Sequence, residues 1–411
     1  MNLKRSNFKE AIIMSTSLLY HAFQIEGVKY KYTSYEGNHI IFKGEINERH
    51  IQCPVCKSID LSFKGKKERR FSLPPLGKKS CFLDLKINRI FCKQCSQTLW
   101  PHLPFMKGKS RMSRSFINFA LDLLTFGTIK SVADFLKISW DCVKDIHKEK
   151  LKAKYNRISI SECIYLSVDE FAISKGHKYM TIFSDVKTGE IVHAIEGKDK
   201  KAIIPFLKKL AKKAKRLKAI AMDMSNAFYS AVKQELPHVD IVFDHFHVMQ
   251  LMTKSLDEIR REQQNILGNS ILKGNRFLLL KNYEDLDVNG MERLKALLTI
   301  NEPLFIAHTL KEQLRGFWMK KNKEEGRDFL KKWCLDAILS GNRLLRKTAK
   351  TIWSRVNELL NYFIHPISNG RTEGINNKIK TMKRQAYGFR DIEYFKLRLY
   401  HLHNQRYSFA G

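Results

Sequence analysis

The chain has 411 residues and a formal net charge of +33, from 74 lysines and arginines against 41 aspartates and glutamates. An excess of this size favours a polyanionic partner, with nucleic acid as the leading candidate. Hydrophobic residues make up 44% of the chain, which excludes wholesale disorder, and eight cysteines are too few for a disulfide scaffold. No run approaches the roughly 20 apolar residues of a membrane span, and the first residues lack a secretory-signal pattern. We therefore expect a cytoplasmic protein with no membrane partner.

The first motif consists of two CxxC pairs in a basic region. Cys53 pairs with Cys56, Cys92 pairs with Cys95, and residues 57–91 separate the two pairs. Each CxxC turn places two thiolates on one side of a tight loop, and two such turns supply the four sulfur ligands that tetrahedral Zn²⁺ prefers. The long spacer predicts a hairpin between the turns. We expect a zinc-binding module over residues 46–105 whose zinc is structural, with four free thiols or a redox CxxC as the alternative.

Two short helices joined by a tight turn are predicted at residues 128–151. Ser131 opens a sequence that resembles a capping box, and Ser139 is placed to cap the second helix. The basic residues of the second helix are expected to face outward toward DNA: Lys144, His147 and Lys148. The pattern favours a helix-turn-helix DNA-binding domain over residues 110–155, and a plain helical hairpin is the alternative.

Residues 160–245 predict three strands, a helix, a strand, a helix and a last strand. Asp169 ends the apolar strand predicted at 164–168, and Asp223 ends the strand that follows a helix at 199–216. Side by side in one sheet, these strands bring the two carboxylates together. With a third acid, they can hold a pair of Mg²⁺ ions roughly 4 Å apart for phosphoryl transfer. Alone, an aspartate after a strand is usually a turn former or a helix cap.

The third acid is expected from the C-terminal region. Glu373 lies in the first turn of a helix predicted after the turn-forming residues 366–370. Basic residues follow along this helix and are expected to hold the DNA backbone: Lys380, Lys383 and Arg384. Three other acids compete for metal contact: Glu170, Asp185 and Asp244. Asp169 and Glu170 cannot both face the metal, because adjacent side chains of a strand point to opposite faces.

Taken together, the motifs resemble a known family. The double CxxC, the helix-turn-helix and the segments SVDE, AMDMS, FDHFHV and SNGRTEGINNKIKTMKRQAYGFRD occur in that order over about residues 50–400. They look like the bacterial insertion-sequence transposases of the ISL-three type. The resemblance implies an α/β RNase H-like core at 160–245 and 366–400, interrupted by an α-helical insertion at 246–365 and preceded by the zinc module and the helix-turn-helix. Residues 1–45 form an N-terminal segment without a motif to compare.

The same resemblance implies a DDE triad of Asp169, Asp223 and Glu373 with Mg²⁺ or Mn²⁺ as the catalytic metal. Such an enzyme binds the terminal inverted repeats of its element, cleaves DNA and transfers the strand to a target. A homodimer on the DNA and association with the nucleoid are further expectations. Two alternatives stay open: a non-catalytic zinc and helix-turn-helix regulator, and an RNase H-like nuclease without strand transfer. In FDHFHV, His245 and His247 are expected either to touch DNA or to pack as a polar strand end.

Overall fold

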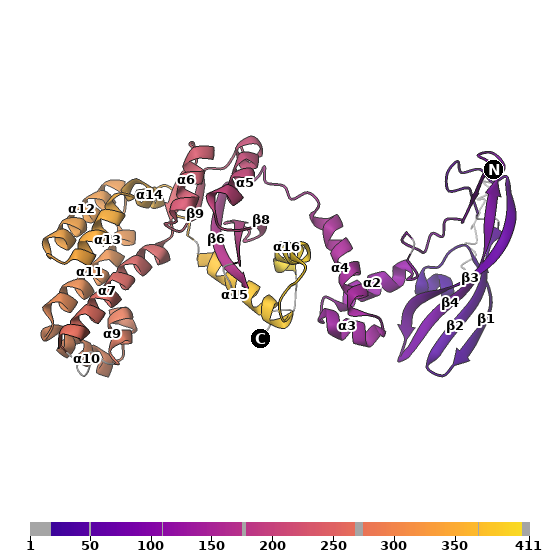
Figure 1. Cartoon of the computed structure of the whole chain (residues 1–411), viewed down its shortest axis with the longest axis horizontal. Helices are drawn as coiled ribbons and strands as arrows, with labels where there is room; N and C mark the ends of the chain where they lie inside the picture. Colours follow the sequence, from indigo (N-terminus) through magenta and orange to yellow (C-terminus); the bar gives the residue numbers. More distant parts are fainter. Residues whose placement is uncertain are drawn as a thin grey trace, which may run out of the picture. The chain divides into compact units, whose positions relative to one another are not determined.

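The computed structural model describes residues 18–48, 51–108, 110–174, 178–267, 274–368 and 370–404, without the side chains of 371–373 and 404. These residues form two compact units that divide after Ala153. Figure 1 labels their helices and strands. Of the predicted N-terminal segment at 1–45, residues 1–17 lie outside the described part.

The first unit is built on a five-stranded sheet with the order β1-β2-β4-β3, in which β5 also pairs with β4. Its elements are α1 (Leu18–Phe23), β1 (Val28–Glu36), β2 (His39–Ile46), β3 (Leu61–Leu76), β4 (Lys79–Cys92) and β5 (Gln97–Leu99). Strands β3 and β4 pair antiparallel from Leu61 opposite Cys92 to Leu76 opposite Lys79. Alternate residues of β4, among them Leu83 and Leu85, enter the core. This pair is the hairpin that the spacer between the CxxC motifs predicts.

Three helices follow in the same unit: α2 (Arg114–Leu123), α3 (Ile129–Leu136) and α4 (Trp140–Tyr155). The two short helices and their tight turn are confirmed, but Ser131 does not cap the first one. Thr128 is the cap and accepts a hydrogen bond from the Ser131 N–H, so α3 begins earlier than the capping box predicts. Ser139 caps α4 as predicted, since its hydroxyl accepts from the Cys142 N–H at 3.3 Å. Between the helices, Lys137 adopts the left-handed conformation that ends α3.

The second unit contains a five-stranded sheet with the order β10-β9-β6-β7-β8. Its elements are β6 (Tyr165–Ser174), β7 (Lys178–Asp185), β8 (Ile191–Glu196), α5 (Lys200–Lys213), β9 (Ala219–Met222), α6 (Asn226–Glu235) and β10 (Asp240–Phe243). The predicted order of strands and helices is confirmed. Strands β6, β9 and β10 run parallel, and β9, which lies between the other two, is buried along its whole length. A continuous apolar run without polar alternation is typical of such a strand.

The two faces of this sheet have different neighbours. Ile220 and Met222 of β9 point into the large core that also contains residues of α5 and α6. Ala219 and Ala221 point the other way and pack with Ile367. Helices α15 (Gly370–Gln385) and α16 (Ile392–Tyr400) contact β6 and β8 respectively, and Figure 1 shows α15 passing along β6. The alternation of side chains therefore decides which acids face α15.

A helical bundle connects β10 to α15, and Figure 1 shows it beside the sheet. Its elements are α7 (His245–Leu267), α9 (Arg276–Leu280), η2 (Tyr283–Asp285), α10 (Val288–Thr299), α11 (Glu302–Arg315), η3 (Gly316–Met319), α12 (Lys323–Leu339), α13 (Arg343–Trp353), α14 (Val356–Leu360) and η4 (Asn361–Phe363). Among the residues described, no helix combines the length and the apolar character that crossing a membrane requires.

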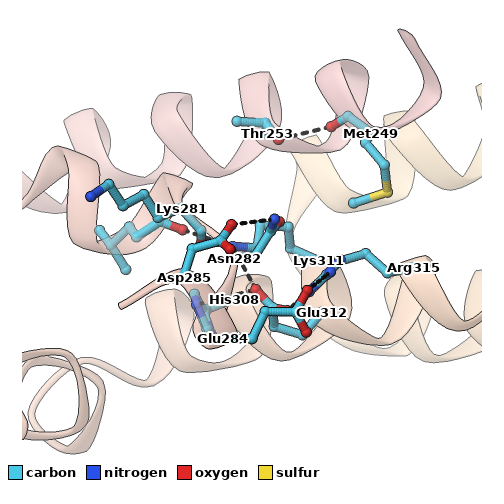
Figure 2. Close-up of polar contacts among 11 residues, drawn as sticks. Met249, Thr253, Lys281, Asn282, Glu284, Asp285, His308, Lys311, Glu312 and Arg315 are labelled. Carbon is cyan, nitrogen blue, oxygen red and sulfur yellow. Dashed lines mark hydrogen bonds and ion pairs between the residues drawn. The ribbon is translucent and has the colours of Figure 1, made fainter. Parts of the chain in front are cut away.

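A buried lysine ties α9 to α11 within the bundle. Lys311 is 1% exposed, and its ammonium donates to the carbonyls of Leu279 and Lys281 at the end of α9. It also pairs with Glu312 at 2.7 Å, as Figure 2 shows. Carbonyls in the last turn of a helix lack partners within that helix, and a cationic side chain satisfies them. Lys311 therefore has a structural role, because its charge is compensated by Glu312 and by the two carbonyl groups.

Candidate active site

Asp169 and Asp223 lie level with each other on neighbouring parallel strands. The register pairs Leu166 with Ile220 and Ser167 with Ala221, and the same offset puts Asp169 beside Asp223. Asp169 also lies on the side of β6 opposite Leu166 and Val168, which are in the large core. Both carboxylates therefore share the sheet face that α15 contacts. The sequence places Asp169 at a strand end, but β6 runs on to Ser174. Only its pairing with β9 stops near Asp169.

Helix α15 contacts this acid pair through Asn376. The Nδ2 of Asn376 donates to Asp169 Oδ2 at 2.6 Å, and the Glu170 N–H donates to Asp169 Oδ1 at 2.7 Å. Burial raises the pKa of Asp169 to about 6, and the nearby charge of Asp223 adds to the rise. The carboxylates of Asp169 and Asp223 repel each other when both are ionised, and a bound cation relieves that repulsion.

His247 completes the polar surroundings of Asp223. Its Nε2 lies 2.8 Å from Asp223 Oδ1, at ion-pair distance, although the contact lacks good hydrogen-bond geometry. Burial alone lowers the pKa of His247, but Asp223, Asp244 and Asp169 outweigh it, so the pKa is raised. The imidazole of His247 is therefore close to these three carboxylates.

The oxygen atoms at this position fit a divalent metal ion. Asp169 and Asp223 offer carboxylate oxygens, and the Oδ1 of Asn376 is buried and accepts no hydrogen bond from any described group. A buried polar atom without a partner is costly, and carboxylate and amide oxygens are the ligands that Mg²⁺ and Mn²⁺ prefer. Among the described residues, Asp169, Asp223 and Asn376 could hold such an ion.

The backbone of Glu373 lies in the first turn of α15, as predicted, but its side chain is outside the described part. Helix α15 nevertheless brings that turn to the acid-bearing face, because Asn376 lies three residues further along the helix. The competing acids have other partners. Glu170 Oε1 lies 3.6 Å from Lys198 Nζ. Asp185 Oδ1 accepts from the N–H groups of Lys187 and Thr188 in the β7–β8 turn.

Asp244 lies between β10 and α7, and the two histidines lie in the first turn of α7. Asp244 is buried, and the register of β10 with β9 sets it beside Asp223. His245 packs edge-on against Trp318 of η3, with ring centroids 4.0 Å apart. The two histidines therefore differ: His245 packs against the helical bundle, whereas His247 contacts an acid of the candidate site.

Sequence reasoning missed Asn376. The available signal was the helical period, because Asn376 follows Glu373 by three residues and so lies on nearly the same helix face. Of the basic residues predicted on this helix, Lys380 and Arg384 are exposed. Lys383 instead donates to the carbonyl of Ala172 in β6 at 2.6 Å, which fastens α15 to the sheet.

The four predicted zinc ligands come together at the base of the β3–β4 hairpin. Their sulfur atoms all lie within 4.8 Å of one another. Cys53 and Cys95 are 3.6 Å apart, and Cys56 and Cys92 are 3.5 Å apart. Four sulfurs bonded to zinc at about 2.3 Å keep a mutual separation of roughly 3.8 Å, so the spacing fits. Hydrogen bonds from the Cys56 and Val55 N–H groups lower the pKa of Cys53 to about 6, which favours its thiolate form.

Of the three residues predicted to face DNA from α4, His147 does not face outward. It is 6% exposed, because it lies on the same side of the helix as the core residue Val143. The expectation for His147 is therefore wrong. Lys144 and Lys148 are half-buried, and Lys144 pairs with Asp141 at 3.2 Å while lying over the ring of Trp140.

Comparison with known proteins identifies the class of enzyme. A family model described as a transposase, of the ISL3 group of DDE transposases, matches residues 166–399. The transposase of insertion sequence element IS1001 from Bordetella parapertussis is 31% identical over 80% of this chain and 83% of its own length. The transposase of IS1557 from Mycobacterium tuberculosis is 25% identical over 75% of this chain and 76% of its own. One solved structure, the Drosophila P element transposase strand transfer complex, matches 74% of this chain and 93% of that chain, with a TM-score of 0.36 and 10% identity.

The chain is thus a transposase, an enzyme that cleaves and transfers DNA strands. It belongs to the ISL3 family of insertion-sequence DDE transposases, as its motifs predict, and DNA is its partner. Membership of this family implies a divalent metal at the catalytic acids, and the cysteine cluster points to zinc in the first unit.

Proposed function

We propose that this transposase binds the terminal inverted repeats of its own insertion sequence, cleaves the DNA there and joins the freed 3′-ends to a target. Asp169, Asp223 and Glu373 form its catalytic triad, with Mg²⁺ or Mn²⁺ as the metal. The sheet of β6–β10 with its flanking helices is an RNase H-like core, and the bundle from α7 to η4 is the insertion within it. The observation that carries the proposal is the placement of Asp169 beside Asp223 on the face where Asn376 of α15 contacts Asp169.

The chemistry consists of two phosphoryl transfers that need no external energy source. In the first, a water oxygen bonds to the scissile phosphorus, and the 3′ oxygen leaves as a hydroxyl. In the second, that 3′-hydroxyl bonds to a phosphorus of the target, and a target 3′-hydroxyl leaves. When bound, divalent metal ions activate the attacking oxygen and stabilise the leaving one. Asn376 orients the Asp169 carboxylate, while Lys380 and Arg384 hold the phosphate backbone.

The first unit supplies DNA recognition in this proposal. The cysteine module over residues 46–105 binds one structural zinc, and helices α3 and α4 form a helix-turn-helix within residues 110–155. Lys144 and Lys148 contact DNA from α4, because both retain exposed surface. Since joining requires two element ends, we propose that the enzyme acts as a homodimer on DNA.

Three substitutions test the triad: Asp169→Asn, Asp223→Asn and Glu373→Gln. An amide keeps the shape of each carboxyl group but removes the charge that holds the metal. Losing several kcal/mol of transition-state stabilisation lowers the rate roughly 10³-fold or more. We expect cleavage of a duplex carrying the flanking repeats to fail with Mg²⁺ or Mn²⁺, while binding to that duplex persists.

Asp185→Asn is the matched control. It removes a carboxylate from the same sheet, and asparagine can keep the turn that Asp185 caps. Its cleavage rate should match that of the unmodified enzyme. Near-normal cleavage by a triad variant would refute that assignment. If cleaved ends accumulate without joining to added target DNA, the enzyme is a nuclease and the strand-transfer part of the proposal fails.

A further inference from the structure

Helix α13 carries a row of positive charges that the proposed chemistry does not use. Residues 340–355 include five cationic residues and no acidic one. Four of them are spaced at intervals of one helical turn or one residue, so they share one side of the helix: Arg343, Arg346, Lys347 and Lys350. All four are exposed.

The opposite side of α13 fixes its orientation. Leu345, Ala349 and Ile352 are fully buried in the bundle. The hydroxyls of Ser255 on α7 and Thr348 on α13 are 2.7 Å apart and hydrogen-bonded. The helix cannot rotate without exposing these apolar residues, so the cationic side is held facing away from the bundle core. There it lines a shallow groove of about 430 Å³, together with Thr351 and Ser354.

Three of these charges have no counter-charge in the described part of the chain. Arg343 pairs with Glu262, but no described acid pairs with Arg346, Lys347 or Lys350. Elsewhere in the bundle, a comparable group of cations does have an acidic partner, since Arg260, Arg261 and Arg276 all pair with Asp257. Positive charges without nearby negative partners raise the local electrostatic potential and attract a polyanion.

The row leads toward the candidate active site. Just beyond α13, the Arg355 guanidinium lies 3.6 Å from the ring centre of Tyr229 on α6. Arg355 also donates to the side-chain oxygen of Asn226 at 2.8 Å. Asn226 begins α6 and lies three residues after Asp223. The end of the cationic row is thus joined to the segment that carries a proposed catalytic acid.

We propose that the α13 groove, defined by Arg343, Arg346, Lys347, Lys350, Thr351 and Ser354, binds the phosphate backbone of duplex DNA that extends from the active site. This inference rests on the proposed function, because it names a surface for the same DNA. Arg343 and Lys350 are about 10 Å apart along the helix axis, which matches about three base pairs of a duplex. Lysine, arginine and hydroxyl groups are phosphate ligands, so the contact is independent of base sequence.

The test compares two lysine pairs on adjacent helices of the full-length enzyme. Lys347→Ala with Lys350→Ala removes two charges from the groove. Lys331→Ala with Lys332→Ala removes two exposed charges from α12, where Asp328 and Asp336 each lie four residues from Lys332 along the helix. Binding is measured by fluorescence anisotropy on a random-sequence duplex, without divalent metal, at several salt concentrations. Thermal unfolding verifies that each variant is folded.

We expect the 347/350 variant to bind roughly tenfold more weakly at low salt, with a salt dependence shallower by nearly two slope units. The 331/332 variant should bind like the unmodified enzyme. Charge reversal, Lys347→Glu with Lys350→Glu, should weaken binding further. Equal losses from both alanine pairs, or no loss from the 347/350 pair, would overturn the inference and leave the proposed function intact. An unmodified enzyme that does not bind duplex DNA would overturn both.

Discussion

Asn376 is the side chain that connects α15 with Asp169. It donates at 2.6 Å to a carboxylate whose pKa burial and Asp223 already raise. A hydrogen bond to a charged group contributes about 1.5–3 kcal/mol. Without it, the Asp169 carboxylate loses both a fixed orientation and part of the stabilisation of its charged form. Asn376 is therefore a positioning residue for the metal-binding acid.

We predict that Asn376→Ala lowers the cleavage rate roughly 10- to 100-fold, in line with that hydrogen-bond energy. The Mg²⁺ concentration for half-maximal cleavage should rise, which a purely structural residue would not cause. DNA affinity should stay unchanged. Asn377→Ala is the control, because Asn377 is the next residue and is exposed. Equal effects of the two substitutions on the Mg²⁺ requirement would contradict the assigned role.

Asn376 also marks the limit of what the sequence predicts at this scale. Asp169 and Asp223 can be paired from sequence, because each comes after a short apolar run and parallel neighbours align their ends. The choice between Asn376 and Asn377 depends on how α15 is rotated against the sheet, which is a property of tertiary packing. His147 was mispredicted for the same reason: basic character does not reveal which side of α4 packs against α2 and α3.

At the scale of elements, Asp84 joins three strands of the first sheet. It lies on β4 directly opposite Lys43 of β2 and Arg70 of β3. Asp84 is 5% exposed, and its oxygens accept from Arg70 at 2.7 and 2.8 Å and from Lys43 at 2.6 Å. Arg70 and Lys43 together lower the pKa of Asp84 against the opposing effect of burial. The pairing of the strands places Asp84 opposite two cations, and the attraction between these charges in turn stabilises that pairing.

We predict that Asp84→Asn destabilises the first unit by about 2–3 kcal/mol at neutral pH, because two cations lose a buried partner while retaining some contact with water. The pKa of Asp84 is lower in the folded state than in the unfolded one. Its contribution is therefore present above about pH 4 and is lost as the pH falls through the folded-state value. Chemical unfolding of both proteins across this range should show the difference shrinking in acid.

Glu45→Gln serves as the control for Asp84, because Glu45 pairs with Lys31 on the exposed surface of the same sheet. Exposed ion pairs contribute little, so this variant should unfold almost like the unmodified protein at every pH. A difference between Asp84→Asn and the unmodified protein that stays constant below pH 4 would mean that the aspartate acts by shape and not by charge.

At the scale of the whole molecule, the two compact units depend on different sources of stability. The second unit has one large apolar core that continues from the sheet into the helical bundle. The core of the first unit is smaller, and its CxxC turns lie at the end of a long hairpin, where their four sulfur atoms cluster. In such a module, metal binding contributes folding free energy directly. The two units should therefore respond differently to loss of zinc.

The last prediction follows from this difference. Metal analysis should find about one zinc per chain, and a chelator should lower or abolish the thermal transition of the first unit while leaving that of the second unchanged. Cys92→Ser should have the same effect without chelator. Cys142→Ser is its matched control, because Cys142 lies in α4 of the same unit, outside the cluster of four sulfurs. Calorimetry on these proteins resolves the two transitions. Purified enzyme that holds no zinc, or two transitions that chelation leaves in place, would show that the four cysteines stabilise the hairpin without a metal.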